Sequence, residues 1–455
     1  MTEPPPGYLG AEGRIRQGPA PELVAAGYEL ELADAQLLEH GLTLADIAHT
    51  VAHPAIPDEH RRQLLDGLLE LKIDAPDSRY GDLVNVRERE LEQRVGDAAG
   101  WLNAGRPRRE AGRIAFRIAL RSRLLDLTEA ITRFAAALVE HAREERDTLM
   151  PDYTYLQIAQ PTTAGHWLLS FAYPALRDAR RALDDFEATN RSPAGAGGVN
   201  GPRYPLDRAR LASLLGFNGP IEHTRDAMWQ TDGFAEATWH AALAATGAAR
   251  FAEDLEIFGS EEFGLLSIGD ELCRASALMP QKRNPYALVV IRGGARTLLG
   301  RATGVLASQQ TASARTDNLL YVYGEVAGAV ELATRLLNLA AKTAETLTID
   351  RPRAERRLRE SAAMATDAAE LLTPELDYRS AYKRVGRAVA AGELPDLDPR
   401  EAIATRTVTG GAAAEPMDAM LADCTQTVAK LREAVTTRRE AIAAAEAELL
   451  RLARR

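Results

Sequence analysis

The stretch that decides the fold of this chain is Ala275-Ser-Ala-Leu-Met-Pro-Gln-Lys-Arg-Asn-Pro285. It holds a hydroxyl at Ser276, a cation at Lys282 and an amide at Asn284, and small residues flank the serine. Taken alone, the stretch fits two interpretations. It is either a reactive loop or a Met-Pro turn followed by an exposed Lys-Arg pair, and the rest of the chain has to decide between them.

The apolar residues on both sides of this stretch follow a helical pattern. Two sets recur at steps of three or four residues, which places each set on one face of a helix. The first is Leu124, Leu127, Ile131, Phe134 and Leu138, and the second is Val326, Val330, Ala333, Leu337, Ala340 and Ala344. Alternating, strand-like runs are nearly absent. We therefore predict an all-α fold with a bundle of long helices, in which these stripes form either an intrachain core or an oligomer seam.

Composition narrows the function classes. The chain has 455 residues, enough for two or three domains, and a net charge of −10 argues against a general affinity for nucleic acid. Cys273 and Cys424 are the only cysteines, too few for a disulfide framework or a zinc site. No long apolar run predicts a membrane span, and Met1 to Gly7 does not resemble a signal peptide. We expect a cytoplasmic protein that needs no metal and no cofactor.

Three segments together resemble the fumarase/aspartase superfamily. The stretch at 275–285 is similar to its mobile catalytic loop, Gly-Ser-Ser-x-Met-Pro-x-Lys-x-Asn-Pro, and its second half points to the argininosuccinate lyase branch. Residues 151–166 resemble the family's Thr-His segment, and residues 95–110 resemble its Thr-Gly-Arg-Ser-Arg-Asn-Asp segment. Further matches at 192–208, 259–264 and 363–389 extend the resemblance, in order, over most of residues 80–395.

The resemblance implies an architecture of three helical domains. We expect an N-terminal helical domain over 1–103, a central long-helix bundle over 104–350 and a C-terminal domain with a terminal helix over 351–455. Members of this superfamily are homotetramers in which each active site collects segments from three subunits. The resemblance therefore also implies a shared site, assembled from the three segments only in the tetramer.

The resemblance assigns roles to individual residues. Ser276 is the expected base that removes a proton beside a carboxylate, and Lys282 and Asn284 stabilise the charge that develops on that carboxylate. Substrate contacts are expected from five further residues: Met279 in the loop, Thr154 and Gln157 in the second segment, and Arg108 and Arg109 in the third, because paired arginines suit a dicarboxylate.

Other polar residues in these segments have plainer interpretations. Arg113, Arg117 and Arg121 continue the arginine run at intervals of four residues, and we expect them to form a solvated helix face. His166 ends the second motif, and we expect it to be a packed, hydrogen-bonded histidine.

The chain departs from the family at two places. Tyr155 stands where the family has its active-site histidine, and Val289 stands where that histidine's glutamate partner is expected, seven residues after Lys282. Tyr155 is therefore a candidate catalytic residue that either donates a hydrogen bond or a proton in place of the histidine or shapes the pocket. A tyrosine is a weak acid at neutral pH, but a leaving group that departs as a stable anion needs no proton. In addition, the polar residues that suit the arginine part of argininosuccinate are largely replaced by apolar ones in Ala314 to Tyr323.

These departures shape the expected activity. The resemblance implies a carbon–nitrogen lyase that performs β-elimination on a substituted succinate and releases fumarate. Argininosuccinate is not the expected substrate, and a nitrosuccinate-type compound of secondary metabolism is one candidate. Two alternatives remain open. The chain is a non-catalytic, structural homologue, or it uses the same fold for a different addition or cyclisation.

Overall fold

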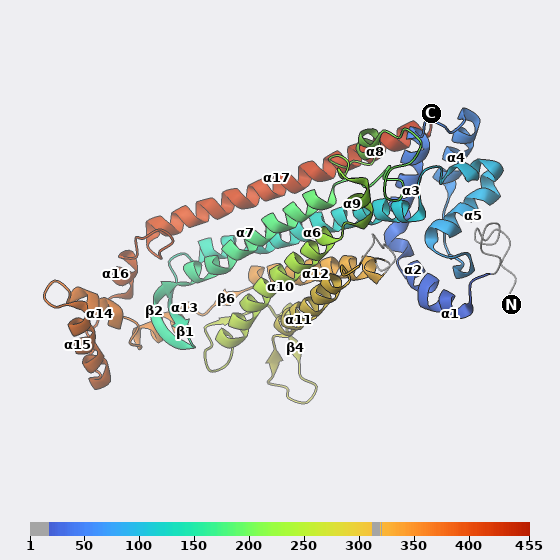
Figure 1. Cartoon of the computed structure of the whole chain (residues 1–455). Coiled ribbons are helices and arrows are strands. Elements are labelled where there is room, and N and C mark those ends of the chain that lie inside the picture. The colour runs from blue at the N-terminus through green and yellow to red at the C-terminus, as the bar shows by residue number, and fades with distance from the viewer. Residues whose placement is uncertain (1–17, 312–318, 320) are drawn as a thin grey trace.

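The computed structural model describes residues 18–311, 319 and 321–455 of the chain. These residues form an elongated and almost entirely helical molecule, as Figure 1 shows. Short N-terminal helices gather at one end, long helices run through the middle, and a small group of C-terminal helices forms the other end. The predicted all-α fold is confirmed.

Long helices form the centre of the molecule. They are α6 (Arg108–Glu144), α7 (Ala164–Thr189), α10 (Asp232–Phe258), α11 (Tyr286–Ala307) and α12 (Tyr323–Glu345). With 37 residues, α6 is roughly 55 Å long. It packs along α7 and α12, while α10 packs on α7, α11 and α12. Both predicted apolar stripes, on α6 and on α12, are buried inside this bundle, so they form intrachain core rather than an oligomer seam.

The N-terminal end is built from short elements. They are α1 (Pro21–Leu23), the π-helix η2 (Val24–Tyr28), α2 (Glu29–Ala33), α3 (Ala35–Ala52), α4 (Asp58–Glu70), α5 (Leu83–Val95) and the 3-10 helices η3 (Ser78–Tyr80) and η4 (Gly96–Trp101). Their apolar side chains, such as Ile47 and Leu64, pack with Ile114 near the start of α6. This packing fixes the first turn of α6 against the N-terminal end. Between α7 and α10 the chain forms α8 (Arg208–Leu214) and α9 (Thr224–Trp229).

The expectation of a solvated arginine face on α6 is wrong. Arg113, Arg117 and Arg121 are buried, with 1–3% of each residue exposed. Each donates hydrogen bonds to backbone carbonyl groups where other helices end: Arg113 to Met228, Arg117 to Ala188 and Thr189, and Arg121 to Leu215 and Gly216. Terminal carbonyl groups lack a partner within their own helix, so a guanidinium can be buried among them without a carboxylate. Burial lowers the pKa of Arg117 and of Arg121 to about 10.

The strands are short and occur in antiparallel pairs. In the described part of the chain, β1 (Leu149–Thr154) pairs with β2 (Gln157–Thr163), β3 (Leu266–Ser267) with β6 (Thr348–Ile349), and β4 (Arg274–Ala275) with β5 (Arg283–Asn284). The 3-10 helix η5 (Asp270–Leu272) precedes β4. The β1–β2 pair lies at the end of the bundle where α6 ends and α7 begins, whereas the β4–β5 pair projects from the side of the bundle near α11 (Figure 1).

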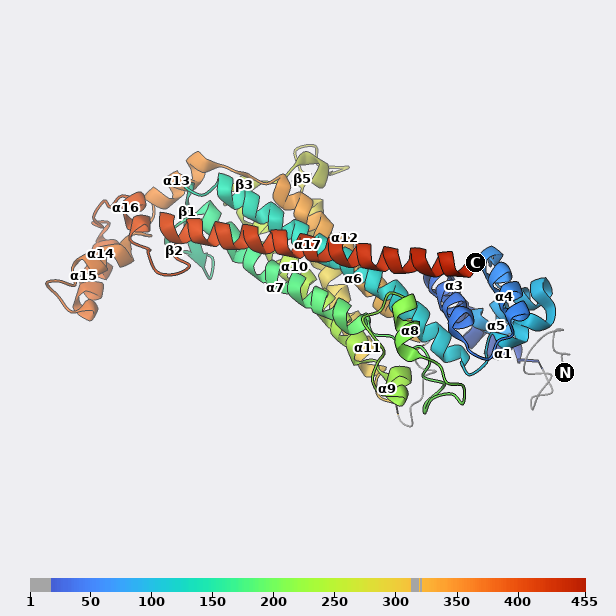
Figure 2. The same cartoon turned by 90° about the horizontal axis from the view of Figure 1, so that it is seen from above.

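The C-terminal region divides into a small cluster and one long helix. The cluster contains α13 (Arg351–Arg359), α14 (Ala365–Leu371), α15 (Tyr378–Ala391) and α16 (Pro399–Ala404). The helix α17 (Ala414–Ala453) then runs back along α6 and α7 to the N-terminal end, as Figures 1 and 2 show. The predicted domain boundaries stay a prediction, and α17 belongs by its packing to the bundle rather than to the C-terminal cluster.

Among the helices that the structure describes, none combines the length and the hydropathy that a membrane span requires.

Candidate active site

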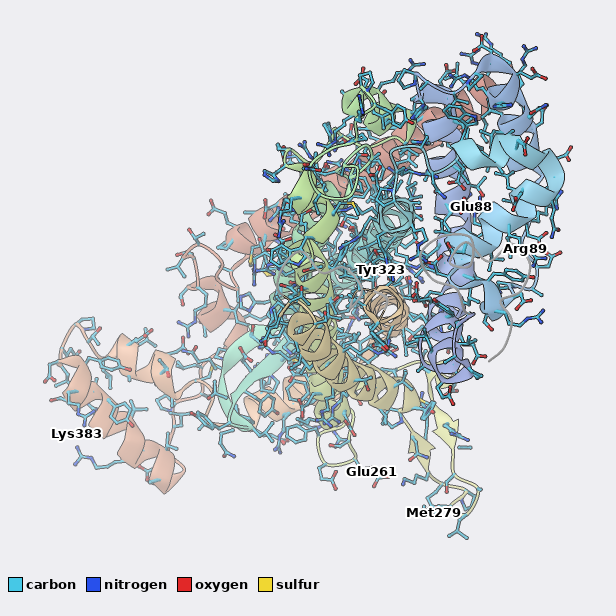
Figure 3. The ribbon with its side chains drawn as sticks, turned by 45° about the vertical axis from the view of Figure 1, so that its right-hand side comes forward. Glu88, Arg89, Glu261, Met279, Tyr323 and Lys383 are labelled. Carbon is cyan, nitrogen blue, oxygen red and sulfur yellow. The ribbon has the colours of Figure 1, made fainter. Side chains whose placement is uncertain are left out.

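The loop with the predicted base is the tip of the β4–β5 hairpin. The two strands below this tip are held in place by two contacts. Asn284 Nδ2 donates a hydrogen bond to the carbonyl oxygen of Arg274 (3.0 Å), and Arg283 forms an ion pair with Asp270 (2.7 Å). Arg283 also donates to the carbonyl group of Ile268. Figure 3 shows Met279 at the outer end of this hairpin, away from the helical body. The tip is therefore an exposed arm with a fixed base.

The oxygen of Ser276 has a distinctive environment. Its Oγ atom accepts hydrogen bonds from the backbone N–H groups of Leu278 (3.3 Å) and Met279 (3.0 Å). Two such donors stabilise negative charge on the oxygen, which a serine needs in order to act as a base. Lys282, exposed in the same loop, forms no ion pair with another residue that the structure describes. It is therefore available to a substrate, whereas the amide of Asn284 is engaged at the hairpin base.

The second segment forms the β1–β2 hairpin, and its tip has an unusual backbone. Tyr155 and Leu156 form a two-residue turn between Thr154 and Gln157, with positive φ angles of 54° and 57°. A turn of this kind normally contains Asn-Gly, because bulky residues pay about 1–2 kcal/mol each for the left-handed conformation. The turn presents the side chain of Tyr155, which is 99% exposed, beside the exposed Thr154 and Gln157. Strain of this kind concentrates at functional sites.

The third segment places the two predicted arginines in the first turn of α6. Arg108 pairs with Asp82 (3.1 Å), and Arg109 pairs with Glu31 (3.0 Å). Burial raises the pKa of Glu31, and the neighbouring Arg109 partly offsets this effect. Within one chain both arginines thus already have carboxylate partners, so a substrate carboxylate would have to compete with them. Their role in substrate binding stays a prediction.

Two further residues of the motifs, Arg106 and His166, form hydrogen bonds that stabilise the fold. Arg106 is buried and donates to Asp46 Oδ1 (2.6 Å) and to the carbonyl group of Ala45 (3.0 Å). His166 contacts Thr162 Oγ1 (3.1 Å) and the carbonyl oxygen of Gly410 (3.0 Å) through its two ring nitrogens. The interpretation of His166 as a packed, hydrogen-bonded histidine is confirmed.

Glu110 is a residue that the sequence analysis missed. It is buried in the first turn of α6, and its carboxylate accepts the backbone N–H groups of Gly195 and Gly197, both at 2.7 Å. These bonds fix the Gly-rich segment 192–202 to the first turn of α6. Burial raises the pKa of Glu110, while the two N–H donors lower it. Two features of the sequence could have predicted this contact: a glutamate in the first turn of a helix, and a glycine-rich segment whose N–H groups need partners.

One chain does not bring the three segments together. The β1–β2 hairpin follows the C-terminal end of α6, whereas Arg108 opens this helix, which is roughly 55 Å long. The β4–β5 hairpin projects separately from the bundle in both Figure 1 and Figure 2. Ser276, Tyr155 and Arg108 therefore lie at three separate places, and a single chain does not complete the predicted site.

Comparison with known proteins identifies the family. The family described as lyase matches residues 41–300, more than half of the chain, and this range includes all three segments. The chain belongs to this lyase family. It is 32% identical over 376 residues to argininosuccinate lyase of Halorhodospira halophila, covering 79% of this chain and 81% of that protein. It is 33% identical over 372 residues to argininosuccinate lyase of Dechloromonas aromatica, covering 81% and 79%.

Solved structures agree on the fold of this lyase. A variant of EDDS lyase with bound fumarate superimposes with a TM-score of 0.83 at 23% identity, covering 96% of each chain. The 3-carboxy-cis,cis-muconate lactonizing enzyme from Pseudomonas putida gives 0.65 at 18% identity, covering 92% of this chain and 99% of that chain. The predicted membership of the fumarase/aspartase superfamily, on its argininosuccinate lyase-like branch, is confirmed.

Proposed function

We propose that this protein is a carbon–nitrogen lyase that eliminates an amine or another nitrogen group from a substituted succinate and releases fumarate. The observation that carries the proposal is the environment of Ser276, whose Oγ atom accepts two backbone N–H groups in an exposed loop next to Lys282. The argininosuccinate lyases to which the chain is similar support the same class of reaction.

The proposed reaction begins with removal of a proton by Ser276 from the carbon beside a carboxylate. The resulting charge on that carboxylate is stabilised by Lys282, and by Asn284 if loop closure releases its amide from the hairpin base. The C–N bond then breaks, and its electron pair leaves with the nitrogen. Thr154, Gln157 and Met279 hold the succinate part, and Arg108 and Arg109 bind its carboxylates once these displace Asp82 and Glu31.

We further propose that the site is completed by other copies of the chain in a homotetramer. The separation of Arg108 from the two hairpins supports this assembly. The exposed face of α11 offers a suitable contact surface, because Val289, Leu299 and Leu306 are exposed there. On the same helix a Cβ atom at Gly293 or Gly300 would meet nothing within 4 Å, so a second helix can approach closely.

Subunit mixing tests the shared site directly. Ser276→Ala and Arg108→Ala proteins are expected to be inactive alone, yet to regain part of the activity after they are mixed, unfolded and reassembled. Mixed tetramers would contain some sites with both native residues. A fully active monomer would contradict the shared site, and so would mixtures that never regain activity although they form tetramers.

The leaving group is not expected to be that of argininosuccinate. The stretch 314–323, in which family-typical polar residues are replaced, lies mostly outside the described residues, so this expectation rests on sequence. Fumarate formation should be followed by ultraviolet absorbance with argininosuccinate, adenylosuccinate, aspartate, nitrosuccinate and N-substituted aspartates. We expect one or more of the last two classes to react, and the signal to vanish in the Ser276→Ala protein.

The second candidate is a non-catalytic homologue, which the replacement of the family's histidine and glutamate by Tyr155 and Val289 favours. A folded tetramer that forms no fumarate from any member of the panel would support this candidate, or an addition or cyclisation that yields a different product.

A further inference from the structure

A large cavity that the sequence analysis did not anticipate opens between α7 and α10, beside the β1–β2 hairpin. Its volume is about 470 Å³, which lies within the range of cavities that bind small molecules. Most of the residues that line it are apolar or aromatic, and they include Phe134, Trp167, Phe171 and Phe258. Tyr155 and Leu156, at the tip of the hairpin, also line it, so the cavity adjoins one segment of the proposed active site.

The charged side chains that line the cavity are mostly acidic. They are Asp152, Asp178 and Asp254, with Arg250 as the cation. Asp178 is buried, and one of its carboxylate oxygens forms an ion pair with Arg181 (2.5 Å). Its other oxygen lies 3.7 Å from the point that a Cβ atom on Gly247 would occupy. The missing side chain of Gly247 therefore leaves this carboxylate open to the cavity.

Asp254 lies on the same helix as Gly247, two turns further along, and is also short of donors. Its Oδ2 atom accepts a long hydrogen bond from Trp167 Nε1 (3.4 Å). Burial raises the pKa of both Asp254 and Asp178, because water is removed from each carboxylate before enough donors replace it. A cationic ligand would supply the missing stabilisation.

The phenol of Tyr153 provides an independent indication of a polar ligand. Its oxygen is buried in the wall of the cavity and has no hydrogen-bond partner in the described part of the chain. The ring is fixed by packing on Phe258 and Phe263, with centroid distances of 5.2 and 5.5 Å. Buried hydroxyl groups almost always have a partner, so this one is placed to accept a hydrogen bond from a bound molecule.

We propose that this cavity binds an organic ammonium ion with an apolar or aromatic body. The carboxylate of Asp254 and the phenol of Tyr153 receive the N–H groups, while the carboxylate of Asp178, further along the cavity beside Gly247, adds negative charge. The aromatic wall takes the body and contributes cation–π attraction. The same cavity also defines a substrate class for the proposed lyase, and this second inference rests on the proposed lyase function. The cavity takes the amine half of an N-alkyl or N-arylalkyl aspartate, whose succinate half reaches the hairpin tip.

This assignment explains how the reaction proceeds without the family's histidine. The nitrogen of such an aspartate is already a secondary ammonium at neutral pH. Ser276 alkoxide takes the proton from carbon, the C–N electron pair moves to nitrogen, and the products are Ser276 hydroxyl, fumarate and a neutral primary amine. No general acid is consumed. Nitrite, in contrast, is an anion that the three carboxylates would repel.

Calorimetric titration of the assembled full-length protein tests the cavity without any turnover. The probes are benzylammonium, its neutral isostere benzyl alcohol, and benzoate. We expect benzylammonium to bind at least about tenfold more tightly than benzyl alcohol, and benzoate not to bind. Asp254→Asn should weaken benzylammonium binding about tenfold, whereas Asp184→Asn, on the exposed side of α7, is the matched control and should change nothing.

Tyr153→Phe is a second variant, used because Asp178→Asn also breaks the Arg181 pair. It keeps the ring packing and should weaken benzylammonium binding a few-fold without lowering the thermal stability. Three results would each overturn the proposal: equal affinity for the ammonium ion and the alcohol, an affinity for benzylammonium that Asp254→Asn does not change, or no binding at all. The last result is the one expected if a second copy of the chain covers the cavity.

Turnover of N-benzylaspartate separates this inference from the proposed function. If benzylammonium binds as predicted but no substituted succinate yields fumarate, the cavity stands and the lyase proposal fails. If fumarate forms and Asp254→Asn leaves the rate unchanged, the lyase stands and the amine half binds elsewhere, so the inference fails.

Discussion

The two hairpins that present the proposed site residues are held in opposite ways. The β1–β2 hairpin pairs at five positions, from Leu149 and Thr163 to Thr154 and Gln157, with one register shift between Pro151 and Tyr153. It packs on α13, α16 and α7. The β4–β5 hairpin pairs at two positions only and carries its long tip into solvent. One is a fixed platform with strain at its turn, and the other is a projecting arm joined to the body by a short paired base. A base that must reach a substrate belongs on the arm, and groups that define a pocket belong on the platform.

The largest effect is expected at the tip of the arm. Ser276→Ala removes the proposed base, and positioned general bases contribute about 10²–10⁴-fold to rates, so kcat for fumarate formation should fall by about that factor. The melting temperature should change little, because Ser276 is only half-buried, in the tip of the hairpin and away from the core. Ser267→Ala, at an exposed position in β3, is the control. A decrease in kcat of less than threefold would show that Ser276 is not the base.

The base of the arm should matter for rate and not for stability. Arg283→Ala removes the ion pair with Asp270 and the hydrogen bond to Ile268, so the arm samples more orientations. We expect kcat to fall about tenfold, because small misplacements of reacting groups are costly. The free energy of unfolding should change by less than about 0.5 kcal/mol, as for an exposed pair.

Arg335→Lys, in an exposed ion pair on α12, is the matched control for general surface effects. A large fall in the free energy of unfolding of the Arg283→Ala protein, together with the fall in kcat, would show that Arg283 supports the whole fold.

The helices behind the platform contain a titrating pair. His240 on α10 contacts Asp185 on α7 at 2.9 Å. This hydrogen bond raises the pKa of His240 above its ordinary value of 6.5, whereas burial is the larger influence on Asp185 and raises its pKa in spite of the same bond. The folded state therefore binds the histidine proton more tightly than the unfolded state. The resulting stability is fully present below about pH 6.5 and is lost as the pH rises through the folded pKa.

His240→Gln should consequently destabilise the protein by about 1 kcal/mol at pH 6 and by clearly less at pH 9. Chemical denaturation at both values measures the difference. A loss that is equal at the two values would assign the effect to packing and not to the charge.

Relief of the strained turn at the tip of the β1–β2 hairpin should change the stability of the protein. Leu156→Gly removes the cost of a left-handed leucine, since glycine adopts a φ of 57° freely. We expect the free energy of unfolding to rise by up to about 1 kcal/mol, while looser placement of Tyr155 raises KM. Leu278→Gly, in the exposed tip of the arm, is the control and should bring no stabilisation. A less stable Leu156→Gly protein would show that the turn is not under strain.

The smallest effect is expected for the phenol at the end of the platform. If the leaving nitrogen is already an ammonium, Tyr155 supplies no proton, and Tyr155→Phe should change kcat less than about threefold. A hundredfold loss would instead make Tyr155 the general acid that replaces the family's histidine.

Sequence reasoning succeeded where a property is local. The loop from Ser276 to Asn284, the helical stripes and the family could be read from residue order, because spacing along a helix and motif chemistry need no distant partner. It failed for Arg113, Arg117 and Arg121, whose spacing matches that of a solvated face. Their partners are carbonyl groups at the ends of three other helices, and no local pattern encodes such a partner.

The sequence by itself determined the all-α fold, the family and the chemical groups of the loop. Only the tertiary structure decided that the stripes are intrachain core, that Ser276 Oγ accepts two backbone N–H groups, and that the three segments lie apart in one chain. It alone placed Asp178 and Asp254, distant in sequence, at one cavity. The physical reason is that hydrophobic periodicity fixes which face of a helix is buried, whereas the neighbours of each side chain depend on how all the helices pack together.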